Sequence, residues 1–179
     1  MLVKTIDKAE KIVGYIGLEG CIIAALAIIF NFGVIIADVF GRFVLHKAVR
    51  GSSEYVGLGE TVLIFFGMAY TQHKKGMVEI TFFMRKLPGH GPMICWTLVN
   101  WLSAIVGVLL TYASFVHAGF LKTMKAATDT LYIPYYPFYY LMAIGLTLFA
   151  IELIFGAVRN TVGLFNRDLR ERIISEWPM

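Results

Sequence analysis

Three glutamates lie inside long apolar stretches of this chain, and their surroundings decide what chemistry they can perform. Glu19, Glu60 and Glu152 stand where a charged side chain costs about 2.5–3.5 kcal/mol to insert into a membrane. Carboxylates in such places serve in proton relays, in ion pairs or in contacts between helices. Glu19 and Glu152 are near the ends of their runs, which favours structural roles. Glu60 lies about two helical turns inside its run, so it must be protonated, paired or covered by polar protein.

A second group of charged residues flanks the first connection between apolar runs. Asp38 and Arg42 are four residues apart, a spacing that places both on one face of a helix and allows an ion pair. Glu54 opens the next apolar run. We expect Arg42 and Glu54 to clamp the two ends of this connection together.

The other reactive side chains form no catalytic motif. The four histidines fall at the ends of runs or in loops, whereas bis-histidine haem ligation needs facing pairs buried among the spans. Neither a Ser/His/Asp arrangement nor a zinc-binding spacing appears. The sequence therefore predicts no enzyme activity, no cofactor and no metal site. A haem-binding membrane anchor of a redox enzyme, with His46 or His117 as ligand, remains an alternative.

Long apolar runs must position these groups. The chain has 179 residues, of which 58% are hydrophobic and 16% charged, and its mean hydropathy is +0.71. Continuous runs of about 20 apolar residues cross a bilayer as helices, whereas strands of membrane barrels are shorter and alternate. We expect an all-α integral membrane protein that forms a single membrane domain, residues 1–179. Four transmembrane helices are expected at about residues 12–37, 54–71, 93–118 and 135–158, followed by a cytoplasmic tail, 159–179.

The connection over residues 39–53 alternates apolar and basic residues in pairs. This pattern favours a short helix that lies in the membrane interface between spans 1 and 2. A plain loop is the alternative.

Lysines and arginines are distributed unevenly among the segments that join the runs. Eleven of the 16 lie in the N-terminal segment, the second connection and the tail. Because excess positive charge marks the cytoplasmic side, both termini are expected in the cytoplasm. The net charge of +4 therefore reflects membrane topology, and no nucleic-acid partner is expected.

Small and polar residues recur at helical spacing along each run. Helices in lipid associate through such residues, because lipid tails are as apolar as leucine. The candidates for contacts within the subunit or with a partner are Asn31, Glu60, Gly67, Asn100 and Glu152. Ordinary four-helix packing explains most of them without any ligand.

The order of these features resembles a known family, the DctQ-like small membrane subunits of tripartite ATP-independent periplasmic (TRAP) transporters. The elements that carry the resemblance are, in chain order, Asp38-Val39-Phe40-Gly41-Arg42-Phe43-Val44, Glu54, Gly67, Lys74-Lys75, Val78-Glu79-Ile80, Leu87-Pro88, Ile133-Pro134 and Pro137. The resemblance covers nearly the whole chain, although each motif is short.

The resemblance implies a four-span protein of the bacterial inner membrane and a specific set of partners. A large, DctM-like membrane subunit would carry the sodium and substrate sites and move as an elevator. A periplasmic binding protein would deliver the substrate, typically an organic acid. The small subunit would then be a scaffold, surrounded by membrane lipids, that supports the large subunit and helps form the docking face. Asp38, Arg42 and Glu54 would organise the structure near that face.

A standalone proton-coupled carrier that uses Glu60 is the main alternative to a scaffold. Such carriers usually have broken helices or inverted repeats around a site at the membrane midplane, and the sequence shows neither. Because a small subunit is not expected to touch the substrate, the sequence does not identify that substrate.

Overall fold

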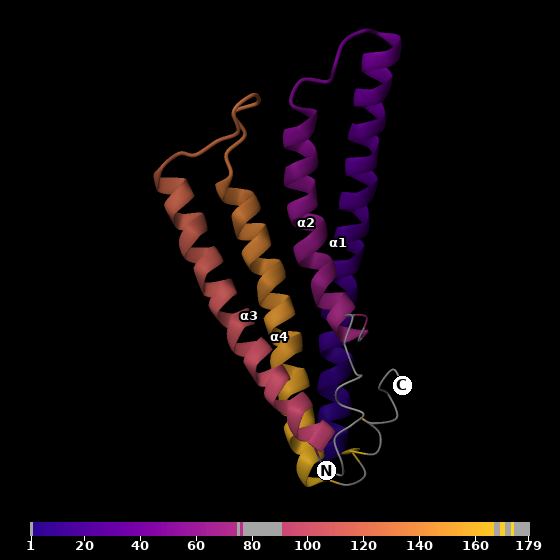
Figure 1. The fold of residues 1–179 in the computed structure, drawn as a ribbon, viewed down its shortest axis with the longest axis vertical. Helices are drawn as coiled ribbons and strands as arrows, with labels where there is room; N and C mark the ends of the chain where they lie inside the picture. Colours follow the sequence, from indigo (N-terminus) through magenta and orange to yellow (C-terminus); the bar gives the residue numbers. More distant parts are fainter. Residues whose placement is uncertain (1, 75, 77–90, 167–168, 171–172, 174–179) are drawn as a thin grey trace.

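The computed structural model describes residues 2–74, 76, 91–166, 169–170 and 173. It contains four helices, α1 (Leu2–Val44), α2 (Ser52–His73), α3 (Gly91–Thr123) and α4 (Tyr136–Phe165), which confirms the all-α prediction (Figure 1). Three of the predicted family elements, the position Lys75 and the segments 78–80 and 87–88, lie outside the described residues, and so does His90.

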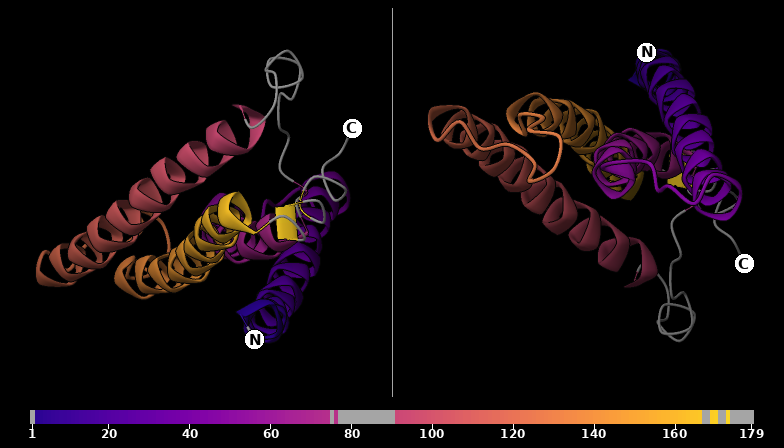
Figure 2. Two further views of the ribbon diagram at one scale, coloured as in Figure 1. Left: turned by 90° about the horizontal axis from the view of Figure 1, so that it is seen from below. Right: turned by 90° about the horizontal axis from the view of Figure 1, so that it is seen from above.

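The helices form two antiparallel hairpins that lie side by side in a flat layer. Helix α1 pairs with α2, α3 pairs with α4, and α2 packs against α4, so the order across the layer is α1, α2, α4, α3 (Figures 1 and 2). The contact between α1 and α4 is much smaller. The seam between α2 and α4 is therefore the main junction between the hairpins.

Three helices are long and apolar enough to cross a membrane: α1 over Gly17–Val44, α3 over Gly91–Thr123 and α4 over Tyr136–Phe165. Large apolar side chains are exposed along α1 and α3, such as Ile29 and Leu109, which are 68% and 61% exposed. Exposed apolar surface on this scale is stable against lipid tails and not against water. The three helices thus confirm an integral membrane protein.

The connection after α1 differs from the expected interfacial helix. Helix α1 continues to Val44, and residues 45–51 form a loop, so the prediction of a short helix was wrong and the plain loop is present. The physical reason is that the carbonyl of Gly41 accepts hydrogen bonds from the N–H groups of Leu45 and Lys47, at 3.2 and 2.9 Å. These bonds end the helix and turn the chain toward α2.

The connection between α3 and α4 is a compact hairpin loop. Backbone bonds join Thr128 to Ile133 and Ala126 to Tyr135, and an isolated antiparallel bridge joins Ala127 to Pro134. The hydroxyl of the buried Thr128 also accepts a bond from the N–H of Ile133, at 3.0 Å. Several of the loop's backbone groups are therefore paired within the loop itself.

The segment after α4 packs back onto the bundle. Leu169 and Ile173 are buried together with Met93 of α3, and Phe155, Val162 and Leu164 surround them. The tail predicted from residue 159 begins as a continuation of the fourth helix, because α4 extends to Phe165 and buries Arg159 and Asn160. The apolar residues of this segment explain why part of it folds onto the helices.

Candidate functional site

Asp38 ties the end of α1 to the loop that follows it. Its Oδ2 accepts a hydrogen bond from Nε of Arg42 at 2.9 Å and lies 2.8 Å from Nη2, which confirms the expected pair. Its Oδ1 accepts a bond from the backbone N–H of Val49 at 2.9 Å. The Asp38 side chain is 14% exposed and that of Arg42 is 58% exposed. An ion pair with so exposed an arginine stabilises little, so the bond to Val49 is the structurally decisive one.

Gly41 makes room for this loop. A Cβ atom at position 41 would lie 2.6 Å from the carbonyl oxygen of Lys47, closer than any real Cβ approaches a backbone atom. A side chain there would push the loop away from α1 and break the bond between Asp38 and Val49. The carboxylate of Asp38 and the missing side chain of Gly41 therefore both stabilise the same turn after α1.

Glu54 joins the two hairpins at the end of the bundle where both loops lie, which we call the loop end. Its Oε1 accepts a bond from the N–H of Thr130 at 2.7 Å, and its Oε2 accepts one from the N–H of Leu131 at 3.0 Å. Gly51, whose φ of 71° suits glycine, lies directly against the side chain of Leu131. The start of α2 therefore holds the α3–α4 loop by its backbone and by one apolar side chain.

This geometry corrects the predicted clamp between Arg42 and Glu54. Arg42 pairs with Asp38 on its own helix, and Glu54 binds backbone groups 76 and 77 residues further along the chain. Each residue does organise the loop end, but each does so with a different partner. A carboxylate with two N–H donors at this distance needs no arginine to satisfy it.

Substitution of Glu54 is expected to loosen the α3–α4 loop. In Glu54→Ala the N–H groups of Thr130 and Leu131 lose their acceptor, and their hydrogen exchange should quicken by about tenfold or more. Glu54→Gln keeps one acceptor oxygen, so its exchange rates at Thr130 and Leu131 should lie between those of Glu54→Ala and the wild type. Amide exchange followed by mass spectrometry checks this, with Asp129→Asn on the same exposed loop as the control. Equal exchange in the Glu54→Ala and wild-type proteins would contradict the contact.

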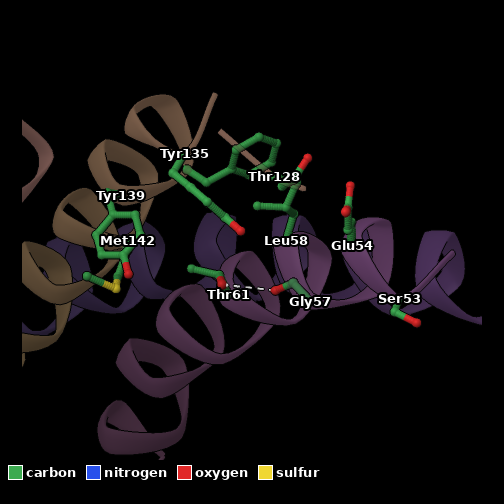
Figure 3. A pocket seen from close by; sticks show the side chains of 10 residues that line it. Ser53, Glu54, Gly57, Leu58, Thr61, Thr128, Tyr135, Tyr139 and Met142 are labelled. Atoms are coloured by element: carbon green, nitrogen blue, oxygen red, sulfur yellow. Dashed lines mark hydrogen bonds between the residues drawn. The ribbon is translucent and has the colours of Figure 1, made fainter. Parts of the chain in front are cut away.

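An open groove lies beside Glu54 between α2 and α4. It has a volume of about 360 Å³, and Figure 3 shows Thr61 and Glu54 of α2 on one side and Tyr139 and Met142 of α4 on the other. Tyr135 and Thr128 also line it, and the hydroxyl of Thr61 donates a hydrogen bond to the carbonyl of Gly57, at 3.0 Å. Aromatic and hydroxyl-bearing side chains line the groove. Both carboxylate oxygens of Glu54 already accept hydrogen bonds from the α3–α4 loop. The groove offers surface for contact and no arrangement for acid–base or nucleophilic catalysis.

At the opposite end of the bundle, His73 and Glu152 form a close polar contact that the sequence did not predict. Nδ1 of His73 lies 3.2 Å from Oε1 of Glu152, whose side chain is only 5% exposed. Gly17 of α1 leaves space here, because a Cβ at that position would lie 3.5 Å from the same Oε1 atom. Three helices therefore meet around this carboxylate. The available signal was that Glu152 interrupts an apolar run and needs a polar neighbour.

The remaining predicted residues divide between buried contacts and exposed surface. Asn31 of α1 is buried directly against Gly59 of α2, and Gly67 lies beside Ala24 on the same seam. Asn100 of α3 lies near Gly156 of α4. Asn31, Gly67 and Asn100 thus lie at contacts between neighbouring helices. Glu60 instead is exposed, and within the described ranges no ion pair includes it.

Two of the histidines considered for haem have other surroundings. The ring of His117 lies 5.1 Å from that of Tyr139, and His46 adopts a φ of 51° in the loop after α1. Among the residues that the structure describes, no group of three or more His, Cys, Asp or Glu side chains is placed to hold a metal ion.

A family model, that of the DctQ component of tripartite ATP-independent periplasmic transporters, matches residues 31–163 of the chain. The chain belongs to this family. The match begins at Asn31 and includes Asp38, Arg42 and Glu54 of the loop end. It also includes His73 and Glu152. No curated protein matches the sequence.

Membership in the DctQ family establishes the general role. The chain is a small membrane component of a TRAP transporter in the bacterial inner membrane, and it is not an enzyme. The family implies two partners, the large DctM membrane component and a periplasmic binding protein.

Proposed function

We propose that the chain is a scaffold subunit that supports the large transport subunit and does not itself bind the substrate. The four helices would be four membrane spans with both termini in the cytoplasm, which places the loop end in the periplasm. The distribution of lysine and arginine supports this orientation. Helix α2 is less apolar than the others, but its 22 residues extend about 33 Å and lie between α1 and α4. That length matches a bilayer core of about 30 Å.

The observation that carries the proposal is the shape of the helical layer. Its four helices run without interruption, and three hollows among the described residues are grooves open to the surface. Secondary transporters instead enclose substrate between broken helices near the membrane midplane. A flat layer with two broad faces, whose loops are held by hydrogen bonds of Asp38 and Glu54, suits the fixed part of a transporter beside a larger moving part.

The activity of the whole assembly completes the proposal. We expect sodium-driven uptake of an organic acid, with the sodium and substrate sites in the large subunit and delivery by the periplasmic binding protein. The compact α3–α4 loop, held by Glu54, would help form the docking face for that binding protein. Its backbone, paired partly within the loop and partly with Glu54, supports this role, because a preorganised surface loses little entropy on binding.

Purification from native membranes tests the scaffold role directly. The tagged chain, extracted in mild detergent, is expected to recover a large polytopic membrane protein in stoichiometric amount. Liposomes that contain both membrane subunits, given the binding protein and a sodium gradient, should accumulate substrate, whereas liposomes with this chain alone should not. Solute uptake by the chain alone would instead establish a standalone carrier, and Glu60→Gln would then be the first variant to assay.

A further inference from the structure

We propose that one face of α2 receives a transmembrane helix of the large subunit, and that this helix presents a cation or another hydrogen-bond donor to Glu60. The face consists of four exposed residues, Ser53, Gly57, Glu60 and Ile64, which we call the α2 ridge. Their spacings of four, three and four residues keep them on one side of the helix. This inference rests on the proposed function and adds the surface and the chemistry of the contact.

Glu60 is the first reason to expect protein, and not lipid, on this face. It is exposed on a helix that lies between α1 and α4, both of which are apolar enough to cross a membrane. A carboxylate that faces hydrocarbon is strongly disfavoured, so such residues face other protein and pair with a donor. Asp38, the nearest acidic residue of α1 along the same groove, is occupied by Arg42 and Val49. In the part of the chain that the structure describes, neither ion pair includes Glu60. The helix proposed here would supply its basic or donor side chain.

Gly57 is the second reason, because the fold of this subunit does not require glycine there. A Cβ at position 57 would meet no atom within 4 Å, whereas one at Gly59 would collide with Asn31 of α1. Gly59 thus serves contact within the subunit, and Gly57 does not. Small residues on a membrane helix let a second helix approach closely. Ser53, one turn before Gly57, adds a second small side chain to this face.

Grooves on both sides of the ridge are the third reason. Toward α4 lies the groove of about 360 Å³ next to Glu54 (Figure 3). Toward α1 lies another of about 340 Å³, lined in part by Ile35 and Val39. Ser53 and Gly57 line both grooves. A ridge flanked by two grooves is the surface that an approaching helix fills with its own rows of side chains. The outer faces of α1 and α3 carry large apolar side chains instead and suit lipid.

Variants of the ridge test this contact in the complex of the chain with its large subunit. Gly57→Leu should lower the amount of large subunit recovered with the tagged chain by about tenfold or more. Glu60→Ala should also lower it, and Glu60→Gln, which keeps an acceptor oxygen, should restore part of it. The matched control is Gly119→Leu on α3, where a Cβ also meets no atom within 4 Å. Unchanged melting of the isolated Gly57→Leu chain separates a lost contact from misfolding.

Cross-linking in membranes locates the partner independently of stability. After Cys21 and Cys95 are replaced by serine, a cysteine at Ser53 or Ile64 is labelled with a benzophenone maleimide. On illumination the benzophenone inserts into C–H bonds of whatever lies against it, and it should join the chain to the large subunit. A cysteine at Leu109, 61% exposed on the outer face of α3, should not. Cross-links from Leu109 alone, or an adduct of two copies of this chain, would overturn the assignment. An intact Gly57→Leu complex without ridge adducts would mean that lipid covers this face, and would also overturn it. If the wild-type chain recovers no large subunit at all, the proposed function itself fails.

Discussion

Gly145→Ala is expected to destabilise the bundle by about 1–3 kcal/mol, because it forces apart the two helical hairpins. Gly145 lies on α4 at the seam with α2, and a Cβ there would lie 2.8 Å from both the carbonyl carbon and the carbonyl oxygen of Phe65. These are backbone atoms, so no side-chain rotation relieves the collision. One of the two helices has to move, and the α2–α4 seam is the main junction between the hairpins (Figures 1 and 2).

The matched control for this substitution has the opposite expected sign. Gly33→Ala lies on α1, where a Cβ would meet no atom within 4 Å, and it should stabilise the chain by about 0.5–1 kcal/mol through helix propensity. The free energy of unfolding in mixed micelles, from a denaturant titration of each variant, measures both effects. A stability of Gly145→Ala equal to or above that of the wild type would show that the seam is looser than described.

His73→Leu is expected to cost about 1–3 kcal/mol, since it removes a polar partner of a deeply buried carboxylate. Glu152 is 5% exposed, and its Oε1 lies 3.2 Å from Nδ1 of His73. A carboxylate left with one polar neighbour fewer in this apolar setting pays a desolvation cost that the helices cannot avoid. The same site contains Gly17 of α1, so the loss should also loosen the contact of α1 with α4.

A double-mutant cycle isolates the contribution of this pair. His73→Leu and Glu152→Leu are measured singly and together, and the double variant should be more stable than the sum of the two single losses predicts. His46→Leu, on the exposed loop after α1, is the control and should leave the unfolding free energy within about 0.5 kcal/mol of the wild type. Additive losses in the cycle would be incompatible with a direct contact.

The sequence by itself determined the class of the protein and the approximate positions of its helices. Apolar runs of membrane length are a local property, so composition and hydropathy sufficed to place four helices. The predicted 54–71 agrees with α2 to within two residues at each end, whereas α1 begins ten residues earlier and ends seven later than the predicted 12–37. The pair of Asp38 and Arg42 was also predictable, because residues four apart on a helix are neighbours whatever the rest of the chain does. The order of short motifs was enough to indicate the DctQ family, which the match over residues 31–163 confirms.

Only the tertiary structure decided the partners of the remaining polar residues. Glu54 binds the backbone of Thr130 and Leu131, and backbone N–H groups carry no sequence signal by which such an acceptor is found. His73 and Glu152 are 79 positions apart on helices whose relative rotation depends on how α2 packs against α4. Local spacing predicts contacts along one helix, whereas contacts between helices depend on close approaches such as that of Gly145 to Phe65. For that reason the sequence identified most of the charged residues that organise this subunit, and the packing of its helices determined which groups they bind.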